Sequence, residues 1–227
     1  MTTTTRRSLD QQHSIVEAAH CYGVVLDTRE IFLYGEVDEV GELGNQFVTN
    51  MRILLSRSSS VPIVIHQHSL GGDWSCGMMI YDSIISCSCP IIFVCHGVAA
   101  SMGTVIPMAC IAHGDAYVIN MPNCDWLIHD GTTGINQGLT MKQARAWAAW
   151  EDRTAKIMTQ WYVEACSRGK MFEGKTKSQI KAKIKSKLNL DEDWWLTARE
   201  AVDYGFADAV LGDEGFESIK SIKEHWS

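Results

Sequence analysis

The chain has 227 residues, a formal net charge of −7 and a hydrophobic fraction of 46%. At roughly 150 residues per domain, these values favour one soluble globular domain and exclude a chain that is disordered throughout. The acidic balance argues against a nucleic-acid partner, because phosphate binding needs clustered positive charge. Small molecules or other proteins are therefore the expected partners.

The eight cysteines predict free thiols rather than a disulfide framework. Several of them stand in apolar segments, and no pair has the CxxC spacing of a zinc or redox site. We expect a reducing, cytoplasmic environment, with no metal and no cofactor. Residues 1–14 lack the apolar stretch of a secretory signal, so residues 1–22 are predicted to form a flexible polar arm.

After the arm, short β-type runs alternate with helical ones. This rhythm predicts βαβ units and a mostly parallel α/β sheet covered on both faces. Strands are expected at residues 31–34, 61–66, 91–95, 116–119 and 126–129. Helices are expected at residues 39–56 and 76–85, with Gly71-Gly72 breaking the pattern between the second strand and its helix.

Residues 83–114 form a run of 32 residues without Lys, Arg, Asp or Glu. A membrane helix would need about 20 predominantly apolar residues in continuous helix. Pro90, Gly97, Gly103 and Pro107 interrupt this run. A buried strand that leads into a buried helix is the better interpretation, although it leaves His96 in need of a partner.

A long helix is predicted over residues 141–168. Thr140 and Gln143 have the spacing of a capping box, and Trp147 and Trp161 follow the helical period. The length exceeds what one small domain needs, so part of the helix is expected to contact another subunit. The lysine-rich residues 175–187 are predicted to form an amphipathic helix with a solvated face, and residues 213–227 a helical tail.

The first chemical candidate is Ser101, in the sequence Gly97-Val-Ala-Ala-Ser101-Met-Gly103. A serine between a strand and a helix can attack a carbonyl while free amides stabilise the oxyanion. Small residues also mark tight helix packing, so the pattern alone leaves both interpretations open.

His66 and His68 share a strand face, but without a third nearby ligand a metal site is not indicated.

Five motifs in the same order resemble those of the ClpP-like serine peptidases, within the wider ClpP/crotonase fold, over about residues 24–212. They are Gly71-Gly72, the Ser101 segment, Ile128-His129, Asp193-x-x-Leu-Thr-Ala and Glu200-Ala-Val-x-Tyr-Gly205-x-x-Asp208. The resemblance implies a fold of repeated ββα and βαβ units, with a peptidase domain over residues 23–212 and a long protruding helix used in oligomer contacts.

The resemblance also implies residue roles. Ser101 would be the nucleophile, His129 the general base and Asp193 the group that orients the imidazole. The amides of Gly72 and Met102 would form the oxyanion hole. Peptide binding by strand addition would involve Gly71, Asp73, Trp74, Gly131, Thr132 and Thr133.

The resemblance implies a homo-oligomer, a ring of seven subunits fed by an AAA+ unfoldase, with residues 1–13 matching the axial loops of the family. Glu192 stands where the family commonly has an arginine that contacts the second ring, which leaves a single ring and a stacked tetradecamer open. Asp130 stands beside His129 where the family tends to have an amide.

The expected activity is a serine endopeptidase acting on unfolded polypeptides or peptides. One alternative is a catalytically silent subunit that scaffolds or regulates an active partner. A lesser one is a crotonase-type acyl-CoA hydratase or isomerase on the same fold.

Overall fold

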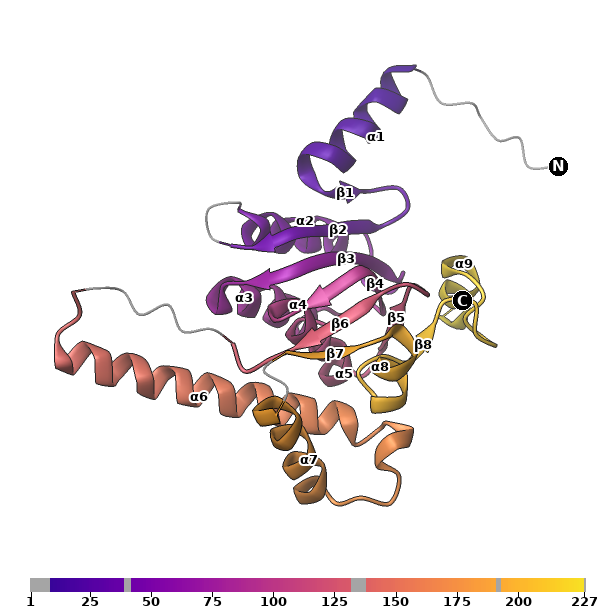
Figure 1. The fold of residues 1–227 in the computed structure, drawn as a ribbon. Helices are drawn as coiled ribbons and strands as arrows, with labels where there is room; N and C mark the ends of the chain where they lie inside the picture. Colours follow the sequence, from indigo (N-terminus) through magenta and orange to yellow (C-terminus); the bar gives the residue numbers. More distant parts are fainter. Residues whose placement is uncertain (1–8, 39–41, 132–137, 191–192, 227) are drawn as a thin grey trace.

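The computed structural model describes residues 9–38, 42–131, 138–190 and 193–226. Its strands form a single sheet of eight, with the order β1-β2-β3-β4-β5-β8; β6 pairs with β4, and β7 pairs with β6 (Figure 1). The strands are β1 Val24–Val25, β2 Glu30–Val37, β3 Ile63–Gly72, β4 Ile91–Ala100, β5 Ala116–Asn120, β6 Asp125–Ile128, β7 Trp194–Leu196 and β8 Ala209–Val210.

The described helices are α1 Leu9–Tyr22, α2 Leu43–Arg57, α3 Trp74–Ile85, α4 Met102–Val105, α5 Met108–His113, α6 Met141–Cys166, α7 Lys177–Leu190, α8 Ala198–Tyr204 and α9 Ile219–Lys223. Two 3₁₀ turns, Lys170–Phe172 and Glu224–Trp226, complete the described elements. The predicted helices at residues 39–56 and 76–85 correspond to α2 and α3.

The predicted parallel α/β sheet is confirmed. The strands from β2 to β5 pair in parallel, and only the pairs β1–β2 and β6–β7 are antiparallel among the described strands. Helices α2, α3 and α5 pack on one face through residues such as Phe47 and Ile80. Helix α9 packs on the other face through Ile222, which clusters with Val64, Ile92 and Val94.

The uncharged run, residues 83–114, supplies the central strand β4 of this sheet. It contains the end of α3, the whole of β4, and helices α4 and α5. Residues 91–95 of β4 are at most 1% exposed, since helices cover the sheet on both faces. No helix within the described ranges is long and apolar enough to cross a membrane.

The strands predicted at residues 61–66 and 91–95 ended too early. Strand β3 runs on through Gly71-Gly72, which pair with Glu36 and Val37 of β2 instead of breaking the pattern. Strand β4 likewise continues past Gly97 to Ala100. Glycine tolerates the positive φ values that these positions adopt, +103° at Gly71 and +57° at Gly97, so each strand bends without ending.

Helix α6 begins as predicted and leaves the body of the molecule at that end (Figure 1). Thr140 and Gln143 form both hydrogen bonds of the capping box. All of the buried residues of the helix lie at Thr154 or beyond, so its first half buries no side chain fully against the described chain. In α7, Ile180, Ile184 and Leu188 are buried, which confirms the amphipathic prediction.

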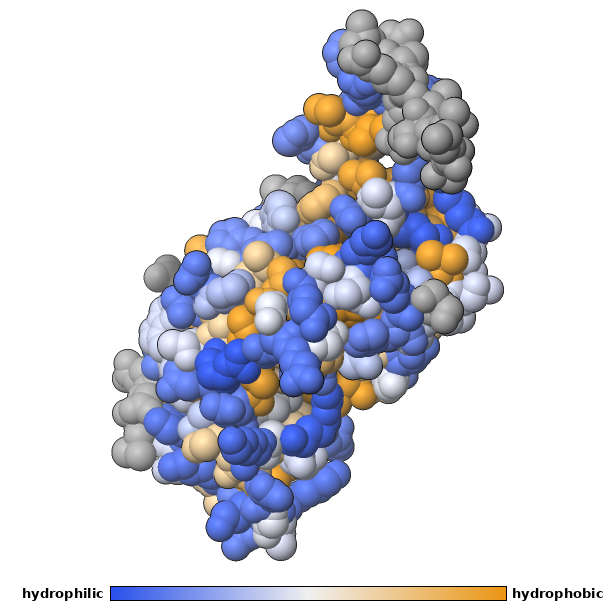
Figure 2. All heavy atoms as spheres, turned by 90° about the vertical axis from the view of Figure 1, so that its right-hand side faces the viewer, coloured by the Kyte–Doolittle hydropathy of each residue, from blue (hydrophilic) through white to orange (hydrophobic). Residues whose placement is uncertain are grey.

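The amino-terminal region contains an element that the sequence analysis did not expect. Residues 9–22 form helix α1, which stands away from the sheet beyond β1 (Figure 1). Figure 2 shows apolar side chains on and below this helix, and Val16 and Tyr22 are 55% and 57% exposed. The division into an arm at 1–22, a domain at 23–212 and a tail at 213–227 stays a prediction.

Candidate active site

Ser101 occupies a strained turn between β4 and α4. Its backbone has φ 52° and ψ −121°, which is rare for a residue with a side chain and costs on the order of 1–3 kcal/mol. The Ser101 amide donates to the carbonyl of Leu127, 2.9 Å away, so the neighbouring strand β6 holds the turn in place. Ser101 is half-buried and lines a cavity at this end of the sheet.

Glycine is required where β3 meets this turn. A Cβ atom on Gly71 would lie 2.6 Å from the Cβ of Ser101 and 2.9 Å from the amide nitrogen of Met102. A Cβ on Gly72 would lie 2.1 Å from the carbonyl oxygen of Val37. The backbone of β3 thus touches the serine turn at Gly71 and lies close to β2 at Gly72, and the lack of a side chain at each position permits this approach.

A buried hydroxyl pair supports the turn from below. The carbonyl oxygen of Ser101 accepts from the Thr104 amide at 2.8 Å and from Thr104 Oγ1 at 2.7 Å. Thr104 Oγ1 also lies 2.6 Å from the hydroxyl of Tyr162 on α6. Because Thr104 donates to the carbonyl, Tyr162 donates to Thr104. Burial raises the pKa of Tyr162, so its hydroxyl keeps its proton.

His129 follows β6 directly. Strand β6 lies beside β4 with Ala100 opposite Leu127, so the histidine ends next to the serine turn. Its Nε2 atom is buried and has no hydrogen-bond partner among the described residues. An unpaired buried ring nitrogen is costly in a structural histidine, whereas a catalytic base needs a nitrogen that is free to accept a proton.

Asp193 precedes β7 and is exposed. Strand β7 pairs antiparallel with β6, with Ile128 opposite Trp194. The pairing ends there, and one further step in this register would set Asp193 opposite His129. The neighbouring Trp194 is 3% exposed and packs on Tyr204 and Phe206, so it anchors the strand.

A cavity of about 500 Å³ joins these parts. Seven of the predicted site residues line it: Gly72, Asp73, Trp74, Ser101, Met102, His129 and Gly131. Gly71 is buried beneath the serine turn, and Asp193 does not line the cavity. The predicted binding residues Thr132 and Thr133, and Glu192, lie outside the described residues.

Helix α6 forms a further wall of the cavity, and none of the five sequence motifs includes it. Trp147 and Trp150 line the cavity together with Glu151. Trp161, further along the helix, is half-buried and stacks on Trp74 and Tyr81. Trp147, Trp150 and Glu151 stand at i, i+3 and i+4, so helical spacing could have predicted that they share one face.

The histidines of the central strands lie outside this cavity. His66 Nδ1 lies 3.0 Å from His96 Nε2, and Phe32 stacks on His66, which gives His96 the partner that its sequence position required. Burial and the neighbouring His96 lower the pKa of His66 to about 4. Within the described ranges, no group of three His, Cys, Asp or Glu residues could hold a metal ion.

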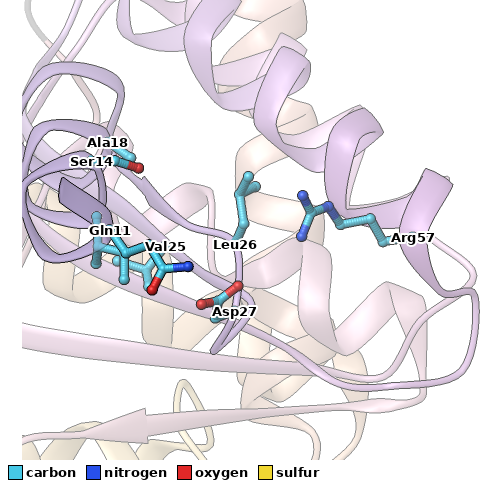
Figure 3. A pocket seen from close by; sticks show the side chains of 8 residues that line it. Gln11, Ser14, Ala18, Val25, Leu26, Asp27 and Arg57 are labelled. Atoms are coloured by element: carbon cyan, nitrogen blue, oxygen red, sulfur yellow. The ribbon is translucent and has the colours of Figure 1, made fainter. Parts of the chain in front are cut away.

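A second cavity, of about 250 Å³, lies between α1, the segment after β1 and the end of α2 (Figure 3). Gln11, Ser14 and Ala18 line it from α1, and Arg57 faces Leu26 and Asp27 across it. It contains neither Ser101 nor His129.

All eight cysteines are free thiols, as predicted, and only Cys21 among them is exposed.

The fold and the serine turn define the class of the protein. A sequence model of the Clp protease family matches residues 12–214, and the chain belongs to that family. The ATP-dependent Clp protease proteolytic subunit 1 of Mycobacterium tuberculosis is 29% identical over 211 residues, which cover 92% of this chain and 93% of that protein.

Two further relatives agree with this assignment. Proteolytic subunit 2 of Treponema denticola is 30% identical over 185 residues and covers 82% of each chain. A solved structure, a point mutant of ClpP1 from Listeria monocytogenes, superimposes with a TM-score of 0.64 at 26% identity, over 82% of this chain and 92% of that one. The predicted ClpP-type fold is therefore confirmed.

Proposed function

We propose that the protein is a serine endopeptidase of the Clp type, in which Ser101 is the nucleophile and His129 the general base. One observation carries the proposal: a serine on a strained turn and a histidine with an unpaired, buried Nε2 line the same cavity of the described chain. Hydrogen bonds between catalytic groups are commonly long in an empty site and shorten when substrate binds.

In this mechanism Ser101 Oγ attacks the peptide carbonyl while Nε2 of His129 takes the hydroxyl proton. The imidazolium then gives that proton to the leaving amine, and water hydrolyses the acyl-enzyme by the same steps. Asp193, opposite His129 in the extended β6–β7 register, would accept from Nδ1 and fix the tautomer. Asp193 therefore acts as a positioning residue.

The oxyanion would be held by the amides of Gly72 and Met102, which both line the cavity. Met102 is the first residue of α4, so its amide has no acceptor within the helix and can donate to substrate. A donor of this kind contributes about 2.7–4 kcal/mol of transition-state stabilisation. The substrate chain would lie extended beside Gly71, Asp73 and Trp74 and, on the other side, Gly131, Thr132 and Thr133.

We further propose that the protein is the proteolytic subunit of a cytoplasmic homo-oligomeric ring of seven, single or stacked in a pair, that receives unfolded chains from an AAA+ unfoldase. The relatives named above are ATP-dependent proteolytic subunits. The first half of α6 supports subunit contact, since Met141 is 72% exposed on a helix whose buried residues all lie at Thr154 or beyond.

Hydrolysis of a quenched fluorogenic peptide by the purified homo-oligomer tests the proposal. Ser101→Ala and His129→Ala should each abolish turnover, while native mass spectrometry shows the same assembly as for the unmodified protein. Turnover retained in Ser101→Ala would overturn the assignment. An assembled protein without any turnover would instead favour the silent subunit.

A further inference from the structure

The cavity beside Ser101 carries negative charge on its walls. Asp73, Asp130, Glu151 and Asp152 line it, and no Lys or Arg does so within the described residues. Residues 132–137, which follow Gly131 in the sequence, contain no charged residue. A cationic group in this cavity would therefore meet acidic side chains, of which Asp152 already pairs with Lys156.

The four carboxylates are not equivalent. Asp73 caps α3 by accepting from the Cys76 amide at 2.8 Å, and Asp152 pairs with Lys156. Glu151 is half-buried, and one of its oxygens accepts from the indole Nε1 of Trp147 at 2.9 Å. Its other oxygen has no hydrogen-bond partner among the described residues, so Glu151 can contact a ligand.

Aromatic rings stand next to this carboxylate. The ring centroids of Trp147 and Trp150 are 5.1 Å apart, with 36° between the ring planes. The hydrogen bond to Glu151 fixes the orientation of Trp147 relative to the carboxylate. Indole faces attract guanidinium and ammonium groups, and a neighbouring carboxylate adds Coulomb attraction. Together, the three side chains offer both interactions to a single basic side chain.

We propose that Trp147, Trp150 and Glu151 bind an arginine or lysine side chain of the substrate, so that the enzyme prefers peptides with a basic residue beside the scissile bond. This inference rests on the proposed peptidase function, because it assigns the specificity of the same cavity. It concerns residues that lie outside the five sequence motifs.

The test uses matched fluorogenic peptides that differ only in arginine or citrulline beside the scissile bond. Citrulline has nearly the shape of arginine without its charge. We expect kcat/KM for the arginine peptide to be about fivefold higher or more at low salt, and the ratio to fall as salt screens the charge. Equal values for the two peptides would overturn the inference and leave the peptidase assignment intact.

Two variants localise the preference. Glu151→Gln should reduce the arginine-to-citrulline ratio, while the indole faces still attract the charged side chain. Glu164→Gln, on the same helix but outside this cavity, should keep the ratio. The salt dependence of the unmodified protein tests the same point if Glu151→Gln does not assemble. A ratio unchanged by Glu151→Gln in an assembled protein would refute the role of this side chain.

Peptide binding tests the preference for a basic residue independently of catalysis. With Ser101→Ala, fluorescence polarisation should show tighter binding of the arginine peptide than of the citrulline peptide. The binding comparison does not depend on hydrolysis. If no peptide is hydrolysed by the unmodified protein, only the peptidase assignment is refuted. Equal binding of both peptides would refute the basic-residue preference.

Discussion

The hydroxyl pair of Thr104 and Tyr162 offers a quantitative test of how α6 supports the serine turn. Thr104→Val removes the hydroxyl while keeping the shape of the side chain, and it leaves the Tyr162 phenol without its acceptor. Tyr162→Phe removes only the outer donor, since Thr104 still donates to the carbonyl of Ser101 at 2.7 Å. Both side chains are completely buried, at 0% exposed.

The magnitudes follow from this geometry. Thr104→Val leaves the buried phenol of Tyr162 without an acceptor, which should lower the free energy of unfolding by about 1–3 kcal/mol. Tyr162→Phe loses one hydrogen bond, which should lower it by about 1 kcal/mol. The double variant leaves no stranded phenol, so it should be less destabilised than the sum of the single variants, with a coupling of about 0.5–3 kcal/mol.

Urea unfolding followed by tryptophan fluorescence measures these differences. All variants are compared at one protomer concentration, because the stability of an oligomer depends on it. Tyr22→Phe, at a tyrosine that is 57% exposed, is the control and should change the stability by less than about 0.5 kcal/mol. Strict additivity of the two single changes would refute the coupled arrangement.

Three further changes test separate parts of the structure. Gly71→Ala should slow labelling by a serine-directed probe about tenfold or more, because the new Cβ would lie 2.6 Å from the Cβ of Ser101. The control is Gly114→Ala, which is also at positive φ but in open space and should not slow the labelling. Arg29→Met should cost about 2–3 kcal/mol in urea unfolding, since its buried guanidinium donates to the carbonyls that end α2; unchanged stability would contradict this role. His66 has a folded pKa of about 4 against 6.5 in the unfolded chain, because burial disfavours its charge, so the unfolded chain binds the proton first and stability falls from about pH 7 to pH 4. His66→Gln should recover up to about 3 kcal/mol of that loss when the free energy of unfolding is measured from pH 7 to pH 4. If the free energy of unfolding depends on pH in the same way with and without His66, the lowered pKa of His66 is contradicted.

The sequence predicted the region around Ser101 well because its physical signals are local. An uncharged, β-branched run can be buried on both faces of a sheet, and small residues at its end permit a tight turn. The capping box at Thr140 likewise set the start of α6, since its two hydrogen bonds depend on residues only three positions apart. His129 was brought to Ser101 by the pairing of two parallel strands that are close in the chain.

The features that the sequence did not predict depend on contacts between distant segments. Helical spacing places Trp147 and Glu151 on one face of α6, but it does not say that this face meets the serine turn. The partner of His96 is His66, 30 positions earlier on the neighbouring strand. Pro107 separates α4 from α5, where a single helix after Ser101 had been expected, because proline lacks the amide that a continuous helix uses.

The central claim is that Ser101 is an activated nucleophile. The most direct measurement is covalent labelling of the assembled protein with a fluorophosphonate probe, followed by tandem mass spectrometry to locate the adduct. We predict one adduct per chain, on Ser101, that disappears in Ser101→Ala and becomes much slower to form in His129→Ala. An adduct on another residue, or labelling that persists in Ser101→Ala, would contradict the account.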